Sequence, residues 1–266
     1  MTAMTAMRRT SGGARTTSAG ASVLRILAIG FALAAAGCST GRIPSFEASR
    51  SGPDQPFQTG PTLAPHQISG ARGTLTSARL DLVSGTDSAT VTSADLGDAL
   101  FQAVTPADAR QIPQAAVSGG AVTVSLRDAP GPGPAQVTVV LNSRVDWSVS
   151  FDAGASAEHV DLTGAHLKSL VFAAGSSSIS ATLPAPSGDV TVLMQGGASR
   201  FDVRTPASVP YRISFGSGAG SAIVDGVVHS GIAAGTVITS PSWDTAANRY
   251  TIAQGAGVSV FDLATG

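Results

Sequence analysis

Three aspartates offer the best case in this sequence for side chains that could act together in chemistry. Asp161, Asp225 and Asp262 each follow a glycine of a repeated motif by seven residues. If the repeats stack on one another, side chains at one repeat position form a column. A catalytic pair of carboxylates needs a defined separation across a groove. The two repeats in between carry Thr182 and Arg204 at this position, so we interpret the aspartates as part of a solvated strand face.

Other polar residues give no catalytic residue, no metal site and no cofactor. Asp202 follows its glycine by five residues and so belongs to a different position. His159 and Asp161 alternate with apolar residues and share an outward face, but two ligands do not complete a metal site. The glycine-rich stretch 216–220 precedes a predicted strand, whereas a phosphate cradle needs a following helix N-terminus and usually a lysine. The Gly-x-Ser-x-Gly motif of serine hydrolases does not occur in residues 74–266; its one match, at residues 37–41, spans the end of the predicted signal.

One segment interrupts the repeats and contains possible binding residues. Residues 227–248 lengthen the spacing between two repeats and include Trp243, His229 and Asp244. Tryptophan is frequent at binding hot spots, and insertions on one face of a repeat protein often carry binding. Alternatively, the segment folds back and caps the last repeat, with Trp243 buried. The sequence leaves both alternatives open.

The elements that would position these residues are short strands in a regular repeat. A large apolar residue lies three positions before each of four small-residue steps, at Phe151, Phe172, Met194 and Phe215. The leading glycines of the steps are 21, 22 and 21 residues apart: Gly154, Gly175, Gly197 and Gly218. Apolar and polar residues alternate with period two on both sides of each step, which is typical of strands with one buried face.

This spacing predicts an all-β, single-domain solenoid of stacked coils, because glycine allows a tight step between strands and the period of about 20 residues suits one coil. The same register recurs around Gly85, and around Gly255 with Ile252 three residues before it. We expect a short irregular cap near residues 95–135 and capped first and last coils. The alternative fold is a β-sandwich of hairpin-joined strands.

The N-terminal region indicates export. Residues 1–38 combine four arginines, an apolar run and Gly37-Cys38-Ser39, which is typical of a secretory signal. The segment resembles a bacterial lipoprotein signal, which implies lipidation of Cys38; an ordinary signal peptide is the alternative. Residues 39–73, rich in Ser, Gly, Pro and Thr, are predicted to be a flexible tether. The repeat domain is predicted to span residues 74–266.

Composition excludes several classes of function. Residues 39–266 carry 12 basic and 17 acidic side chains, so nucleic acid and anionic lipid headgroups are poor partners. Cys38 is the chain's one cysteine, so the repeat domain has neither a disulfide nor a cysteine metal site.

The repeats resemble a bacterial envelope family that includes the putative-adhesin β-repeat domains, the toast-rack domains and the C-terminal domain of LiaF-like cell-envelope-stress proteins. The resemblance covers roughly residues 74–266. It is carried by short motifs: Leu80-Asp81-Leu82 before Gly85, Asp161-Leu162-Thr163-Gly164, Gly175-Ser176-Ser177, Leu183-Pro184-Ala185-Pro186, Gly197-Ala198-Ser199 and Val209-Pro210-Tyr211-Arg212-Ile213 before Gly218-Ala219-Gly220. It implies a β-only, solenoid-like fold and supplies no catalytic residues. LiaF-like proteins carry membrane helices before this domain, where this chain has a signal and a tether.

Three functional hypotheses follow, in decreasing order of preference. The first is a non-enzymatic, membrane-anchored lipoprotein that acts as a binding or adhesion module for an envelope protein or glycan. The second is an envelope-stress accessory protein that binds a membrane partner. The third is a carbohydrate-active solenoid enzyme, which would need a groove with two carboxylates and an arginine or lysine.

Overall fold

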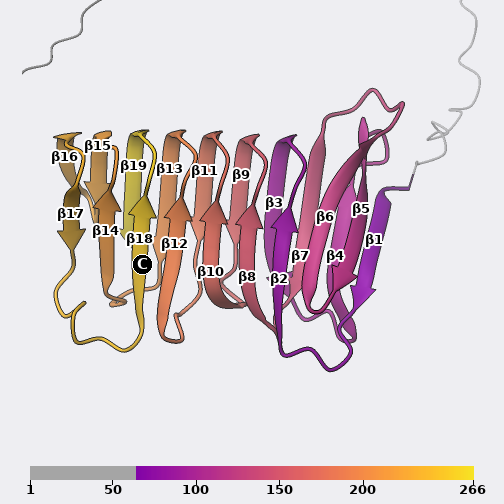
Figure 1. Ribbon diagram of the computed structural model, residues 1–266, viewed down its shortest axis with the longest axis horizontal. Helices are drawn as coiled ribbons and strands as arrows, with labels where there is room; N and C mark the ends of the chain where they lie inside the picture. The colour runs from indigo at the N-terminus through magenta and orange to yellow at the C-terminus, as the bar shows by residue number, and fades with distance from the viewer. Residues whose placement is uncertain (1–63) are drawn as a thin grey trace, which may run out of the picture. The chain divides into compact units, whose positions relative to one another are not determined.

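The computed structural model describes residues 64–266, which form 19 strands in two sheets and no helix (Figure 1). No helix of this region is therefore long and apolar enough to cross a membrane. Sheet A has ten strands, in the spatial order β1 (His66–Ala71), β4 (Ala99–Thr105), β7 (Gln136–Asn142), β3 (Thr86–Ala94), β9 (Ala155–Asp161), β11 (Ser176–Thr182), β13 (Ala198–Thr205), β19 (Val258–Thr265), β15 (Ala219–Val224) and β16 (Val227–Ile232). Sheet B has nine, in the order β17 (Thr236–Thr239), β14 (Tyr211–Phe215), β18 (Arg249–Gln254), β12 (Asp189–Met194), β10 (His166–Phe172), β8 (Asp146–Phe151), β2 (Ser77–Leu82), β6 (Ala121–Asp128) and β5 (Gln111–Ser118).

Each coil consists of one strand in sheet B, a step and one strand in sheet A. Neighbouring coils pair in parallel in both sheets. Parallel neighbours cannot be joined by tight hairpins, so the stacked-coil solenoid is confirmed and the hairpin-joined sandwich is not formed. The small steps are needed because adjacent turns nearly touch: a Cβ on Gly154 would lie 2.5 Å from the carbonyl oxygen of Gly175.

The order of the coils in space differs from their order in the sequence. The last coil, β18–β19, lies between β12–β13 and β14–β15, and the first coil, β2–β3, lies between β6–β7 and β8–β9 (Figure 1). The chain therefore leaves a gap of one coil after β13 and fills it with its final two strands. A periodic sequence predicts coils but not this order, because every coil offers its neighbours similar edges.

The register of the last coil corrects one sequence assignment. Phe172 pairs with Met194, and Met194 pairs with Gln254, so Gln254 occupies the position three residues before the step. The step glycine of this coil is therefore Gly257, not Gly255. A shift of two residues keeps the same side chains facing inward, which is why alternation could not distinguish the two glycines.

Antiparallel strands cap both ends of the stack, but the capped coils are β6–β7 and β14–β15 and not, as expected from the repeats, the first and last coils of the sequence. At one end β4 and β1 extend sheet A and β5 extends sheet B. The predicted irregular cap at 95–135 is therefore partly regular, since it contains β4, β5 and the coil strand β6. At the other end, β16 and β17 pair with β15 and β14, so the insertion at 227–248 forms the second cap.

The folded region begins earlier than the sequence indicates. Strand β1 starts at His66 and pairs with β4, whereas residues up to 73 are predicted to belong to the tether. In β1 only Ile68 is a large apolar residue, so the segment lacks the alternation that reveals a strand. The predicted signal, including Cys38, lies outside the described residues.

Aromatic side chains hold the centre of the core between the sheets. Trp147 is fully buried, and its indole nitrogen donates to the carbonyl oxygen of Asn142 at 2.9 Å. Phe172 stacks on Phe151 with ring centroids 5.1 Å apart and meets Phe201 edge to face at 5.6 Å. This row of rings continues through Phe201, Phe261 and Phe215. The row starts in sheet B, crosses to sheet A at Phe201 and Phe261 and returns to sheet B at Phe215, so Phe215 contacts Phe261 and not the other phenylalanines of sheet B.

Candidate functional site

The outer face of sheet B carries a row of hydroxyl groups across four neighbouring coils. Register pairs run from β8 through β10 and β12 to β18. The row consists of Ser148, Ser169, Thr191 and Thr251, which we call the hydroxyl row. Adjacent strands are about 4.8 Å apart, so the row presents one hydroxyl at each such interval.

An arginine lies at each end of the hydroxyl row. Arg79 pairs with Ser148 across β2 and β8, and Arg212 pairs with Thr251 across β14 and β18. The Arg79 Nε donates to Asp81 at 2.6 Å, so this guanidinium is partly neutralised. Thr251 donates to the carboxylate of Asp189 at 2.8 Å. Both serines of the row have no side-chain hydrogen bond within the described residues.

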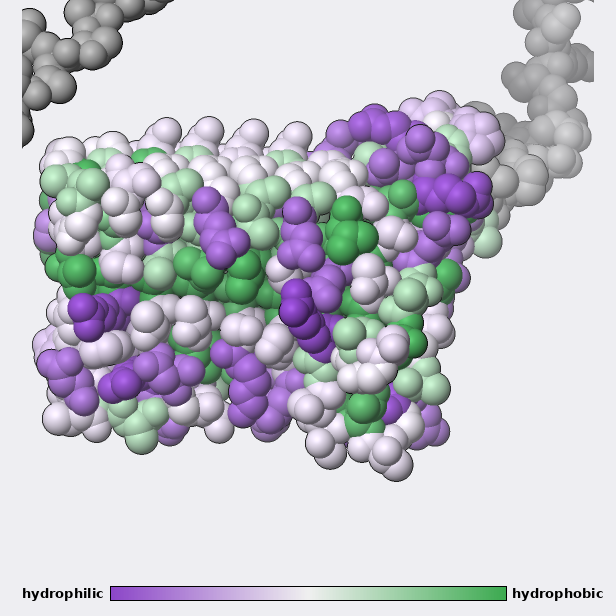
Figure 2. All heavy atoms as spheres, in the orientation of Figure 1, coloured by the Kyte–Doolittle hydropathy of each residue, from purple (hydrophilic) through white to green (hydrophobic). Residues whose placement is uncertain are grey.

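Two further rows flank the hydroxyl row. On one side the register places Val171, Leu193 and Ala253 next to one another, and Figure 2 shows a band of hydrophobic residues crossing this face. On the other side lie ion pairs: Asp146 with Lys168 at 3.2 Å and Asp189 with Arg249 at 3.0 Å. A ligand lying across the coils would thus meet apolar, hydroxyl and charged groups in parallel rows.

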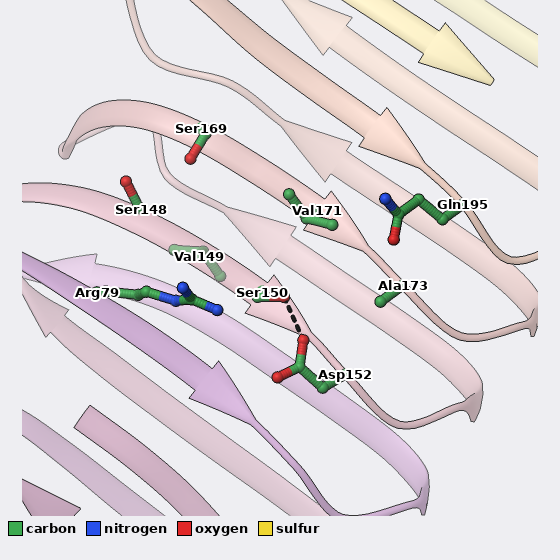
Figure 3. Close-up of a pocket in the computed structure, with 9 residues that line it drawn as sticks. All are labelled: Arg79, Ser148, Val149, Ser150, Asp152, Ser169, Val171, Ala173 and Gln195. Carbon is green, nitrogen blue, oxygen red and sulfur yellow. Dashed lines mark hydrogen bonds between the residues drawn. The ribbon is translucent and has the colours of Figure 1, made fainter. Parts of the chain in front are cut away.

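A shallow groove of about 410 Å³ lies where this face crosses β2, β8 and β10. Arg79 and Asp152 lie on one side and Gln195 on the other, with Ser148 and Ser169 between them (Figure 3). The Ser150 hydroxyl donates to Asp152. Ser148 and Ser169 have short side chains, so a flat or extended ligand can approach the sheet there.

The sequence did not identify the hydroxyl row, although its register contains it. The four residues of the row and the two arginines at its ends all lie six residues before a step glycine: Arg79, Ser148, Ser169, Thr191, Thr251 and Arg212. The signal is visible only when Gly257 is assigned as the step of the last coil, because Gly255 would place Arg249 at this position.

The structure separates the three residues that the sequence suggested for binding. Trp243 and Asp244 lie in the loop between β17 and β18, whereas His229 lies on β16 in sheet A. The Trp243 ring is half-buried between Arg212 and Arg249, whose guanidinium carbons lie 5.0 and 4.3 Å from the ring centroid. Its indole nitrogen donates to the Tyr250 carbonyl oxygen at 3.2 Å, so Trp243 fastens the loop to β18 and borders the Arg212 end of the hydroxyl row.

The three aspartates do not share one position of the repeat. With Gly257 as the step, Asp262 follows its glycine by five residues and pairs with Asp202, so these two share a position. Arg200 contacts both carboxylates, at 2.7 and 3.5 Å, on the outer face of sheet A. This ion pairing raises the pKa of Arg200, with the hydrogen bond to Asp202 as the largest cause.

The other two aspartates have local structural roles. Asp161 accepts hydrogen bonds from the backbone and hydroxyl of Thr163. Asp225 accepts from the Tyr211 hydroxyl at 2.8 Å and from the Thr265 backbone nitrogen at 3.0 Å, which ties the ends of three strands together. Burial and then the hydrogen bond to Asp225 raise the pKa of Tyr211.

Glu158 is an ionisable residue that lies buried in the core, away from both outer faces. Glu158 points inward from β9 between Ala89 and Ile179, is 0% exposed and has no hydrogen-bond partner in the described region. Burial raises its pKa to about 8. Among residues 64–266, no three His, Cys, Asp or Glu side chains lie close enough together to hold a metal ion.

Comparisons with known proteins bear on the fold. No protein-family model and no curated protein matches the sequence. A solved structure of a putative cell adhesion protein from Clostridium sporogenes aligns with a TM-score of 0.53 at 13% identity and covers 75% of this chain and 100% of that one. A putative adhesin from Bacteroides fragilis aligns over 76% of this chain and 98% of that one at 11% identity. Its TM-score of 0.23 is too low to indicate a shared fold. The chain therefore shares the fold of the Clostridium sporogenes protein.

Proposed function

We propose that this chain is a non-enzymatic binding or adhesion module of the bacterial cell envelope and that it binds its ligand on the outer face of sheet B. The observation that carries the proposal is the hydroxyl row, which repeats one polar group per coil between two arginines. A solenoid presents such a row without cost to its core, because outward positions do not take part in packing between the sheets.

A glycan strand of the envelope fits this face better than a compact small molecule. The groove is shallow, and its hydroxyls both donate and accept hydrogen bonds, as sugar hydroxyls do. A linear glycan lying across the coils would meet the same chemistry at successive positions. The neighbouring apolar row of Val171, Leu193 and Ala253 suits the apolar faces of sugar rings. The Clostridium sporogenes protein of the same fold is described as a putative cell adhesion protein, which agrees with a binding role.

The test is binding to purified, insoluble envelope glycan. The double variant Ser169→Val and Thr191→Val removes two hydroxyls and introduces residues that suit strands. Two net hydrogen bonds of about 0.5–1.5 kcal/mol each predict a loss of affinity of roughly 5- to 150-fold in a sedimentation assay. The matched control, Ser180→Val and Thr182→Val on the outer face of sheet A, should bind as the unmodified chain does. Equal binding by all three proteins, or binding to a protein fraction alone, would refute the glycan site.

The anchor is the second part of the proposal. If Cys38 is lipidated, the module is held at the exported face of a membrane, with the segment before β1 as its tether. Cys38→Ser should then move the protein from the membrane fraction to the soluble fraction of the cell. A variant that stays in the membrane fraction, together with no incorporation of labelled fatty acid into the unmodified chain, would exclude the anchor.

The two alternatives make different demands on the structure. An envelope-stress accessory role predicts a membrane protein among the partners recovered from cells. An enzymatic role depends on Arg200 with Asp202 and Asp262, the place in the described region where two carboxylates and an arginine meet. These groups lie on sheet A, away from the hydroxyl row, so variants there separate catalysis from binding.

A further inference from the structure

The two ends of the stack differ in how they are closed. At the first end, β1 and β5 lie against each other across the two sheets, and Figure 1 shows β1, β4 and β5 inclined together there. At the other end, β16 and β17 each pair on one side only, with β15 and β14. We call β16 and β17 the C-terminal cap. Its two strands leave a row of backbone donors and acceptors without partners on the outer edge of each sheet.

The C-terminal cap lacks the features that protect exposed sheet edges. Natural edge strands avoid association through charged residues, prolines or bulges. Residues 227–243 contain no Asp, Glu, Lys or Arg, and neither strand contains proline. In contrast, the edge strand β5 at the first end contains Pro113.

Apolar side chains are also exposed at the C-terminal cap. Five large hydrophobic side chains are exposed in the described region, and three of them lie on β16 and β17. Val227, Val228 and Val237 are 58%, 64% and 45% exposed. An uncharged edge with exposed valines indicates an interface.

We propose that two copies of this chain join through their C-terminal caps, edge to edge around a two-fold axis, so that both sheets continue from one copy into the other. A partner that forms hydrogen bonds with the free backbone edges of both β16 and β17 must itself have two strand edges, as far apart as the two sheets are. A second copy does so by symmetry, and such an isologous contact closes and does not propagate. The proposal is independent of the ligand of sheet B.

The pairing at the C-terminal cap allows one axis to serve both sheets. His229 pairs with Ala222, four residues after Gly218, and Val237 pairs with Ser214, four residues before it. Because the chain reverses at Gly218, these positions lie at matching heights in the coil. An axis normal to the sheets that passes His229 and Val237 pairs each edge strand antiparallel with its own copy and leaves the outer face of sheet B open.

Cysteine crosslinking tests the position of the axis. In the full chain with Cys38→Ser, His229→Cys introduces the one thiol, and the proposed axis places its two copies opposite each other. Cα atoms of such antiparallel pairs are about 4.5–5.5 Å apart, within the range that a disulfide spans. We expect His229→Cys to give a covalent dimer under mild oxidation. The matched control, Ser69→Cys on the edge strand β1, should stay monomeric.

A second measurement does not depend on an introduced thiol. Val228→Asp with Val237→Asp places like charges on both edges and should convert a dimer into a monomer in sedimentation velocity, with an unchanged circular dichroism spectrum showing that the fold is kept. A monomeric unmodified chain at tens of micromolar overturns the proposal, as does a double variant that stays dimeric. Crosslinking at Ser69→Cys instead of His229→Cys would assign the interface to the other end and would also overturn it.

Discussion

Replacing Glu158 with leucine is expected to stabilise the protein at pH 8.5 much more than at pH 4. Below the unfolded value of 4.5, the carboxyl is protonated in both the folded and the unfolded state. Between 4.5 and about 8, the unfolded chain loses this proton while the folded chain keeps it, because burial raises the pKa. Each pH unit in this window therefore lowers the free energy of unfolding by about 1.4 kcal/mol.

Between pH 4.5 and about 8, the titration of Glu158 therefore lowers the free energy of unfolding by roughly 5 kcal/mol in total. Leucine has no titration and resembles Ile179, its neighbour in the same column, so the variant should lack this loss. Urea unfolding of both proteins from pH 4 to pH 9 measures the difference. Glu158→Gln is the matched control, because it keeps the shape and removes the charge. A constant difference between the unmodified chain and Glu158→Gln over this range would show that Glu158 is not held protonated in the core.

Phe172→Ala is expected to lower the free energy of unfolding by about 3–5 kcal/mol, the range for a buried phenylalanine. Phe172 is 0% exposed and touches rings from its own sheet and from the opposite sheet, Phe151 and Phe201. Its removal leaves a cavity at the centre of the stack, where neighbouring coils on both sides resist collapse. Denaturant unfolding, with the slope compared between proteins, measures the loss.

Val117→Ala is the control for this prediction, because Val117 lies on the edge strand β5 and its side chain is 47% exposed. It should change the free energy of unfolding by no more than about 0.5 kcal/mol. Similar losses in the two variants would mean that the aromatic row does not stabilise the fold more than the surface does.

The repeat allowed the solenoid to be predicted, since glycine steps at 21 or 22 residues and alternating strands leave few other arrangements. Leu80 and Leu82 before Gly85 pair with Val149 and Phe151, as that register requires. Glu158 illustrates the strength of the register. Its charge breaks the apolar pattern in the sequence, yet it points inward like Ile179 because the strand on both sides of it is fixed.

The order of the coils and the extent of the caps could not be predicted. Similar coils have similar edges, so the sequence does not state that β18–β19 lies between β12–β13 and β14–β15. Strand β1 contains a single large apolar residue, Ile68, and pairs chiefly through its backbone, which leaves little trace in the sequence. Trp243 could be placed in an insertion but not in its position between Arg212 and Arg249, because that contact joins residues from three separate segments.

The hydroxyl row could be predicted from the sequence only in part. Its positions follow from the register, but one misassigned glycine removes Thr251 and hides the pattern. Small hydroxyl residues also have no strong signal of their own, since serine and threonine are frequent on any exposed strand. Their significance comes from alignment across neighbouring coils, which the structure supplies.

The most direct test of the binding face is photo-crosslinking in intact cells. A photoreactive amino acid at Ser169, in the hydroxyl row, should yield adducts that carry envelope glycan, identified by mass spectrometry after purification. The same residue at Ser180, on the outer face of sheet A in the next strand of the same coil, should yield none. Adducts from Ser180 but not from Ser169, or no adducts from either position, would contradict the assignment of binding to sheet B.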